Sequence, residues 1–254
     1  MIPPAVSRWL AARPGPIGAY ASAYREWRWG DPYVRLVRHL CDPRRASLDI
    51  GAHAGAYTWF LRHYSGRCIA FEPNPNMAAI LRRRFPRGVE VRNVALSDRP
   101  GSAVLRIPLL FDRPDPGRAT IEVNNPIGEA SGLHDPIAVK IVTLDQTVHE
   151  PVGFIKIDVE GHELKILHGA EHILGNHRPN LILELEDRHN PGIVPATFAY
   201  LCERGYGGWF LQAGSMVPIR DFTAERHQNV ARPDTYTNNF VFSADPTLGE
   251  RLGL

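Results

Sequence analysis

The sequence has few cysteines and lacks any long apolar run. Its three cysteines, Cys41, Cys68 and Cys202, are scattered and show no C-x-x-C spacing, so neither a disulfide framework nor a zinc site is expected. A small, odd number of cysteines fits a reducing compartment. No run of about 18 apolar residues is present, and prolines and arginines interrupt the N-terminal residues, so we expect no transmembrane segment and no secretory signal. The sequence therefore predicts a cytoplasmic protein.

A large excess of one charge is also absent. The formal net charge is +2 at pH 7, so overall charge gives no reason to expect nucleic acid or another polyanion as a partner. Lysine occurs only at positions 140, 156 and 165, and arginine carries nearly all of the positive charge. With 254 residues, 44% of them hydrophobic and 22% charged, the chain is long enough for one α/β domain with a full core.

Two acidic residues and a glycine loop form the most informative pattern. A short apolar strand, residues 48–50, carries Asp49 and leads into a loop with Gly51 and Gly55. The helix that follows presents free N–H groups, which favour a carboxylate or a phosphate. A second apolar strand ends in Glu72, 17 positions after Gly55. In nucleoside-binding α/β folds, an acid at about this distance accepts hydrogen bonds from the ribose hydroxyls.

The spacing within the loop separates two classes of cofactor. NAD sites use G-x-G-x-x-G, whereas this chain has D-x-G-x-x-x-G, with His53 where the second dinucleotide glycine would stand. S-adenosylmethionine carries a carboxylate, an ammonium, a sulfonium and a ribose, which suits the loop amides together with Asp49 and Glu72. The pattern therefore predicts an S-adenosylmethionine site. The alternative interpretation is that Asp49 caps the helix and Glu72 opens a turn.

The chain divides into an N-terminal helical segment, residues 1–40, and one domain, residues 41–254. The segment carries Tyr20, Tyr24 and Trp27 at helical spacing, and we expect this face to dock on the domain and cap it. A membrane-surface helix is the alternative, because several arginines lie nearby. In the domain, strand and helix patterns alternate, which predicts a mostly parallel sheet covered by helices.

A long connection, residues 108–136, interrupts this alternation. It is rich in proline and glycine and has no clear periodicity, which is typical of a functional or disordered loop, so we interpret it as a candidate lid over the acceptor. Strands are predicted on both sides of it, over residues 89–94, 101–107, 137–142, 154–158, 181–186, 207–211 and 236–242.

Several longer motifs follow one another between residues 47 and 186. They are Asp49-Ile-Gly-Ala-His-Ala-Gly-Ala-Tyr-Thr, Ala70-Phe-Glu-Pro-Asn-Pro, Asn93-Val-Ala-Leu-Ser-Asp, Val142-Thr-Leu-Asp, Ile155-Lys-Ile-Asp-Val-Glu-Gly-His-Glu and Leu167-His-Gly-Ala. Together they resemble the FkbM family of S-adenosylmethionine-dependent methyltransferases, which more often has Asn in place of His53. The resemblance implies a Rossmann-like class I methyltransferase fold, a mostly parallel seven-stranded sheet with helices on both faces and a reversed last strand.

The resemblance also implies an activity, usually O-methylation of a hydroxyl on a sugar, a polyketide, a lipid-linked compound or another small metabolite. The partner would then be a small-molecule or glycan acceptor, whose identity stays open, as does the oligomeric state. The residues that we expect to hold the methyl donor comprise the glycine loop, the ribose acid and the ends of the third and fourth strands. They are Asp49, Gly51, Ala52, His53, Gly55, Glu72, Pro73, Asn93, Val94, Ala95 and Asp158.

Methyl transfer to an alcohol needs an oxygen aligned with the sulfonium methyl and a base that removes its proton. We expect the base at the carboxyl ends of the fourth and fifth parallel strands. His162 is the first candidate, because an unperturbed imidazole titrates near about pH 6.5. Asp158 is the second and Glu184 the third. Alternatively, Asp158 only pairs with Lys156, and His162 only serves the start of the next helix.

Two other kinds of chemistry are weighed against this prediction. Clustered carboxylates could also hold Mg²⁺, but spacing does not reveal the required octahedral arrangement, and no metal ligand is predicted. The basic run Arg82, Arg83, Arg84 and Arg87 admits an RNA substrate, yet it stands where cations complement a helix dipole, so nucleic acid is not expected.

Alcohol chemistry is also favoured by the residues after the fourth strand. A base N-methyltransferase would show Asn/Asp-Pro-Pro-aromatic where this chain has Asp158-Val159-Glu160-Gly161. The function classes that stay open beside an O-methyltransferase are an RNA or other macromolecule methyltransferase and a catalytically inactive S-adenosylmethionine-binding protein. Steeply salt-dependent RNA affinity would favour the former.

Overall fold

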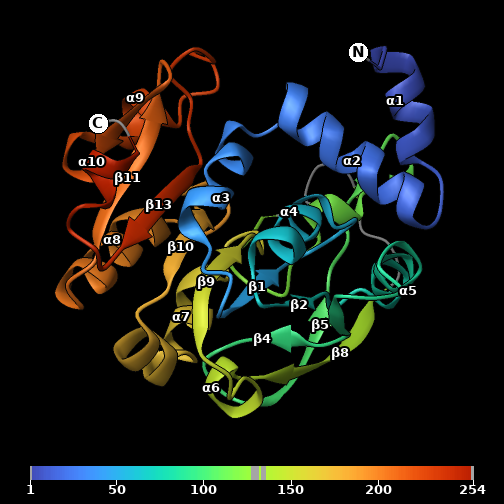
Figure 1. The fold of residues 1–254 in the computed structure, drawn as a ribbon, viewed down its shortest axis with the longest axis horizontal. Helices are drawn as coiled ribbons and strands as arrows, with labels where there is room; N and C mark the ends of the chain where they lie inside the picture. The colour runs from blue at the N-terminus through green and yellow to red at the C-terminus, as the bar shows by residue number, and fades with distance from the viewer. Residues whose placement is uncertain (1, 127–131, 133–135, 253–254) are drawn as a thin grey trace.

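An eight-stranded sheet forms the centre of the computed structural model, which describes residues 2–126, 132 and 136–252 (Figure 1). Its strands in spatial order are β3 (Glu90–Arg92), β2 (Arg67–Phe71), β1 (Ala46–Ile50), β9 (Val152–Ile157), β10 (Asn180–Glu184), β13 (Asn239–Ser243), β11 (Gly207–Gln212) and β12 (Ser215–Pro218). The first five of these are paired in parallel, and β13 is antiparallel to β10 and β11. The predicted α/β sheet with a reversed last strand is confirmed, and the edge strand β12 adds an eighth strand.

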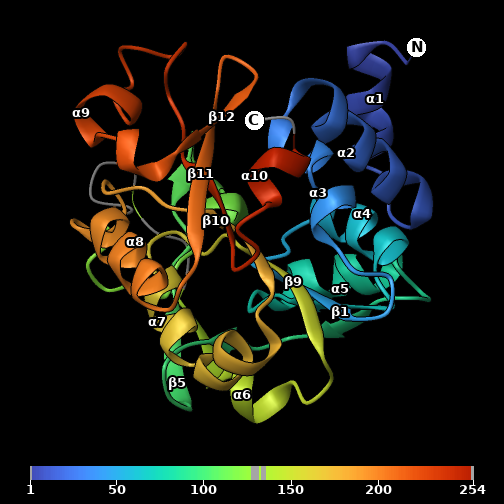
Figure 2. The same ribbon diagram turned by 60° about the vertical axis from the view of Figure 1, so that its left-hand side comes forward.

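Side chains of the sheet alternate between two apolar layers, as both faces of a parallel sheet must be covered. On one side, Ile155 and Leu183 belong to a core that includes residues of α7 and α8. On the other side, Phe154 and Ile182 pack with residues of α3 and α4. Figure 2 shows the central strands between these two groups of helices. The main helices are α1 (Pro4–Ala11), α2 (Pro16–Trp29), α3 (Val37–Leu40), α4 (Ala56–Tyr64), α5 (Pro75–Arg84), α6 (Leu144–Thr147), α7 (Glu163–His168), α8 (Ile193–Glu203), α9 (Ala224–His227) and α10 (Leu248–Arg251).

Two predicted strands differ in detail from the structure. The strand predicted over residues 137–142 is present, but it lies in a separate three-stranded sheet. The members of that sheet are β4 (Ala95–Leu96), β8 (Ile137–Val142) and β5 (Gly101–Leu105). The third strand is shorter than predicted, because the chain leaves the central sheet after Arg92. The helix after β9 stops at His168, and a short π-helix (Ile173–His177) follows it.

The N-terminal helices pack on α4 and α5 through small residues. The buried positions of α2 are Gly18, Ala19, Ala21 and Ala23. The aromatic face that we expected to make this contact points largely outward, since Tyr20 and Trp27 are exposed. Small side chains allow helix axes to approach closely, which leaves the bulky rings at the surface. In the part of the chain that the structure describes, no helix is both long enough and apolar enough to cross a membrane.

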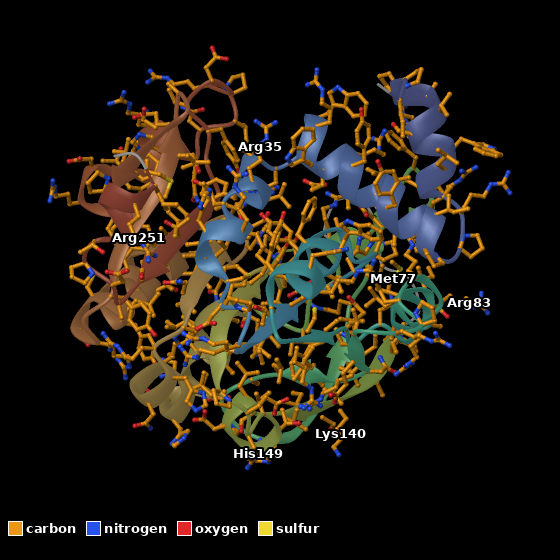
Figure 3. All side chains as sticks on the ribbon, in the orientation of Figure 1. Arg35, Met77, Arg83, Lys140, His149 and Arg251 are labelled. Carbon is orange, nitrogen blue, oxygen red and sulfur yellow. The ribbon has the colours of Figure 1, made fainter. Side chains whose placement is uncertain are left out.

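Arg84 connects the N-terminal helices to the glycine loop. Its guanidinium is buried and donates to the carbonyl oxygens of Ala11 and Ala54, both at 2.6 Å, and to Ser22 Oγ at 3.1 Å. Part of the basic run predicted to face water is therefore structural. Arg83, one residue earlier, is exposed and points away from the molecule in Figure 3.

The described part of the long connection packs beside the carboxyl end of β9. Thr120 Oγ1 and Asn125 Nδ2 both donate to the carbonyl oxygen of Glu160, at 3.0 and 2.7 Å. The segment also contains β6 (Leu109–Leu110), β7 (Arg113–Pro114) and a 3₁₀ turn (Pro116–Arg118). Residues 127–131 and 133–135 of the candidate lid lie outside the described residues.

Replacing Arg84 by alanine should lower the free energy of unfolding by about 1.5 to 3 kcal/mol, because charged hydrogen bonds to three acceptors are lost. Denaturation by urea measures this change. Arg83→Ala on the same helix is the matched control and should stay within about 0.5 kcal/mol of the parent protein. Equal stability of the two variants would show that the Arg84 contacts do not hold the helices in place.

Candidate active site

Two cavities meet at the carboxyl end of the sheet. The first has a volume of about 140 Å³ and the second about 430 Å³. Gly51, His53 and Asp158 line both of them, so the two cavities adjoin at these residues. Ligands of open α/β sheets bind beyond the carboxyl ends of the strands, and the two cavities occupy this position.

The glycine loop has the shape that its sequence predicts. Gly51 has a φ of 77°, and a Cβ at this position would come within 1.8 Å of the carbonyl oxygen of Asp158. Gly55 has a φ of 81° and immediately precedes α4, where a Cβ would meet Phe85. His53 also has a positive φ, of 46°. Asn and His both tolerate this conformation better than most residues, which explains how His53 can replace the Asn more common in the resembling family.

Glu72 lies in the wall of the first cavity and is 6% exposed. Its Oε2 accepts from the backbone N–H of His53 and its Oε1 from that of Asn74, both at 2.8 Å. Burial raises the pKa of this carboxyl to about 7 in spite of these two hydrogen bonds. Each carboxylate oxygen keeps a further lone pair for a ligand hydroxyl, so the residue fits the predicted role of ribose acceptor.

The end of the third strand contributes an apolar part of the first cavity. Val94, Ala95 and Leu96 line it, as expected for a surface that contacts a purine. Asn93 does not line either cavity as the described residues define them. Its Nδ2 donates to the carbonyl oxygens of Glu72 and Pro73, at 2.8 and 2.9 Å, so it positions the end of β2.

The predicted cofactor residues are divided between the two cavities. Those in the first are Gly51, His53, Glu72, Pro73, Val94, Ala95 and Asp158. Asp49 and Ala52 line the second cavity. Asp49 is 2% exposed and accepts a short hydrogen bond from Thr58 of α4, and burial raises its pKa to about 6. Gly55 serves the start of α4 rather than a cavity wall.

His162 lies at the first cavity and is hydrogen-bonded through both ring nitrogens. Nε2 is 2.9 Å from Ser97 Oγ, and Nδ1 is 2.8 Å from Glu122 Oε2. Lys165 Nζ also donates to Glu122 Oε2, at 2.9 Å. Burial opposes ionisation of Glu122, but the hydrogen bonds with His162 and Lys165 lower its pKa to about 2. His162 lines the first cavity but not the second, and both of its ring nitrogens are engaged in hydrogen bonds, so its assignment as the base stays a prediction.

Asp158, Lys156 and Glu184 form a charged group in the second cavity. Lys156 is fully buried, and its Nζ lies 3.8 Å from Asp158 Oδ2, 4.0 Å from Glu184 Oε2 and 3.1 Å from Asn239 Oδ1. Burial and the negative charge of Asp158 raise the pKa of Glu184. Asn238 Nδ2 donates to Glu184 Oε1 at 2.7 Å, which fixes that carboxyl in the cavity wall.

The N-terminal segment supplies another wall of the second cavity. Glu26 of α2 accepts from the backbone N–H of Asp31 at 2.6 Å, and Asp31 accepts from the hydroxyl of Tyr57. All three residues line the cavity, and desolvation raises the pKa of both carboxyl groups. Sequence reasoning did not find Glu26, Asp31 or Glu122, because each reaches the site from an element far away in the chain. The described residues contain no group of three or more His, Cys, Asp and Glu side chains arranged to hold a metal ion.

Comparison with known proteins finds a matching family model and several similar solved structures. The model of the methyltransferase FkbM domain matches residues 49–207 of this chain. The methyltransferase FkbM structure from Methylobacillus flagellatus is 15% identical, with a TM-score of 0.49, and the alignment covers 93% of this chain and 57% of that protein. This chain thus spans little more than half of that protein.

An O-methyltransferase from Bacillus cereus in complex with SAH is also similar. It is 15% identical, with a TM-score of 0.46, and the alignment covers 88% of this chain and 86% of that chain. Comparison with curated proteins finds no match.

The mostly parallel sheet, the reversed β13 and the acid-bearing glycine loop are the features of the class I methyltransferase fold. Because the family model covers more than half of its residues, the chain belongs to the FkbM methyltransferase family. The resemblance deduced from the sequence motifs is thereby confirmed.

Replacing Glu72 by alanine should weaken S-adenosylmethionine and S-adenosylhomocysteine equally, since both carry the same ribose. Loss of a charged acceptor corresponds to about 1.5 to 3 kcal/mol, or about 10- to 100-fold in Kd. Because the pKa of Glu72 is raised to about 7, a proton must leave before the carboxylate can accept from the hydroxyls. Affinity should therefore rise with pH and level off above about 7. Calorimetry across this range on the parent protein and on Glu72→Gln, which should lose the Glu72-dependent rise, measures both effects. Unchanged affinity would remove Glu72 from the site.

Proposed function

We propose that this protein transfers a methyl group from S-adenosylmethionine to a hydroxyl of a hydrophilic small metabolite or glycan. The observation that supports this proposal is the junction of the two cavities at Gly51, His53 and Asp158. The first cavity contains the ribose acid and the apolar purine surface, and the second offers room for an acceptor. When bound, S-adenosylmethionine supplies the methyl group on a sulfonium. Transfer then depends mainly on aligning the acceptor oxygen at the junction.

The walls of the second cavity favour an acceptor with several polar groups. They carry carboxyl groups from Glu26, Asp31 and Glu184, the Lys156 ammonium and the amide of Asn239. A purely apolar acceptor would leave these buried groups without hydrogen bonds, which is costly. A sugar or a similar polar metabolite can satisfy them with its own hydroxyls.

Asp158 is the base that the geometry favours. It lines both cavities, and 37% of its side chain is exposed, so an acceptor hydroxyl can reach it. Lys156 on its buried side holds the carboxylate in place. Burial and the charge of Asp158 raise the pKa of Glu184, which favours its protonated form, so we assign it to acceptor binding rather than to proton removal.

His162 has a different role in this proposal. Through Ser97 and Glu122 it connects α7 to the purine end of the first cavity and to the long connection. It therefore positions the cofactor surface, and its loss should affect cofactor affinity more than the chemical step.

The proposal assigns effects on different constants to two substitutions, one on kcat and the other on the Kd for the cofactor. Asp158→Asn should lower kcat by about 10² to 10⁴, as expected for loss of a general base, with little change in cofactor affinity. His162→Ala should raise the Kd for S-adenosylmethionine and leave most of kcat at saturating cofactor. His53→Asn, which keeps a residue that tolerates positive φ, is the control for the other ionisable group at the junction. Parent-like turnover in Asp158→Asn together with inactive His53→Asn would move the base to His53.

The acceptor class is tested by following the labelled methyl group. Incubation with S-adenosylmethionine and separate pools of sugars, apolar polyketides and RNA should label the sugar pool. The methyl ether product is then identified by its mass after hydrolysis of the labelled pool. Label found in RNA, or stoichiometric cofactor binding with no labelled product in any pool, would contradict the proposal.

A further inference from the structure

The outer surface of the N-terminal segment concentrates tryptophan. Four of the five tryptophans in the chain, Trp9, Trp27, Trp29 and Trp59, lie on α1, α2 and the neighbouring α4. In Figure 1 the two N-terminal helices lie at the edge of the molecule, beyond α4 and α5. Methyl transfer as proposed above uses none of these rings.

Most of these rings are exposed, and Trp59 is partly buried. Ile17 is 63% exposed, Trp9 58% and Trp27 46%. Along α2, Ile17, Tyr20 and Trp27 follow helical spacing and share the face opposite the buried small residues. Tyr20 continues the surface onto α4, where its ring lies 5.6 Å from that of Trp59. Exposed apolar patches of this kind mark a surface that contacts a membrane or another protein.

Arginines accompany every one of these tryptophans. The distances from guanidinium carbon to ring centroid are 3.9 Å for Arg13 and Trp9, 5.8 Å for Arg28 and Trp29, 5.6 Å for Arg35 and Trp27, and 4.2 Å for Arg62 and Trp59. Arg8 is exposed as well, and α5 adds the exposed Arg82 and Arg83 beside α2.

Acidic groups are directed away from this surface. The only acidic residues between positions 1 and 40 are Glu26 and Asp31, and both line the second cavity. The outer face therefore combines aromatic rings with positive charge alone. This charge opposes contact with a second copy of the chain, because arginines would meet arginines. It complements a surface of negative headgroups, and Trp and Tyr beside Arg are the residues that occupy the boundary between headgroups and acyl chains.

We propose that the α1–α2 surface binds anionic lipid bilayers, with the helices lying in the interface. The aromatic and aliphatic side chains would enter the acyl boundary, and the arginines would pair with lipid phosphates. Because α2 also forms a wall of the second cavity, membrane binding would place that cavity close to the bilayer surface.

Co-flotation of the full chain with vesicles tests the proposal without using methyl transfer. Vesicles of phosphatidylcholine containing phosphatidylglycerol should bind the protein, and pure phosphatidylcholine vesicles should bind it at least about tenfold more weakly. Ile17→Ser/Trp27→Ser should reduce binding by about tenfold or more, since it removes exposed apolar area without opening the core. Arg8→Glu/Arg28→Glu should do the same and should abolish the salt dependence.

Val230→Ser/Arg232→Glu is the matched control, because it makes the same kinds of change at exposed residues elsewhere and should leave binding unchanged. Thermal denaturation verifies that all variants remain folded. The proposal fails if anionic vesicles do not bind the parent protein. It also fails if the two α1–α2 surface variants bind these vesicles as strongly as the Val230→Ser/Arg232→Glu control. It also fails if the same surface variants instead abolish RNA binding or a concentration-dependent dimer in the absence of lipid.

Discussion

The register of the parallel strands is the constraint on which the site depends. β1, β2, β9 and β10 are paired so that a single row of residues crosses the sheet near their carboxyl ends. The residues that immediately follow this row are Gly51, Glu72, Asp158 and Glu184. A shift of one residue in any pair would turn the side chains of that strand to the opposite face of the sheet. The apolar layers on both faces prevent such a shift, so core packing and site geometry have the same cause.

The second cavity contains more negative than positive charge, and burial makes that arrangement costly. Asp49 and Asp31 have raised pKa values because they are desolvated, and Lys156 is the buried cation that faces them. Buried attractions between carboxylates and an ammonium group such as that of Lys156 contribute little to stability, since desolvation offsets much of the attraction. In the proposed function, this arrangement fixes polar oxygens around a space where a polar acceptor can replace the lost water.

The N-terminal segment completes the site rather than merely covering the domain. Arg84 ties it to the glycine loop, and Asp31 and Tyr57 join it to the first turn of α4. Tyr33 extends the connection to the far side of the sheet, where its hydroxyl accepts from the backbone N–H of Leu211 at 2.6 Å. The second cavity is consequently bounded by residues from both ends of the chain.

The sequence by itself determined the sheet class, the glycine loop and the position of Glu72 after β2, because these depend on local patterns: apolar strands, positive-φ glycines, and acids placed directly after strands. Short-range spacing also placed Asp158 and Glu184 at the carboxyl ends of their strands, where both line the second cavity. Tertiary structure alone decided that His162 is occupied by Ser97 and Glu122, and that small residues rather than rings bury α2. These outcomes depend on contacts between residues distant in the chain, and no local periodicity encodes which partner a buried polar group will meet.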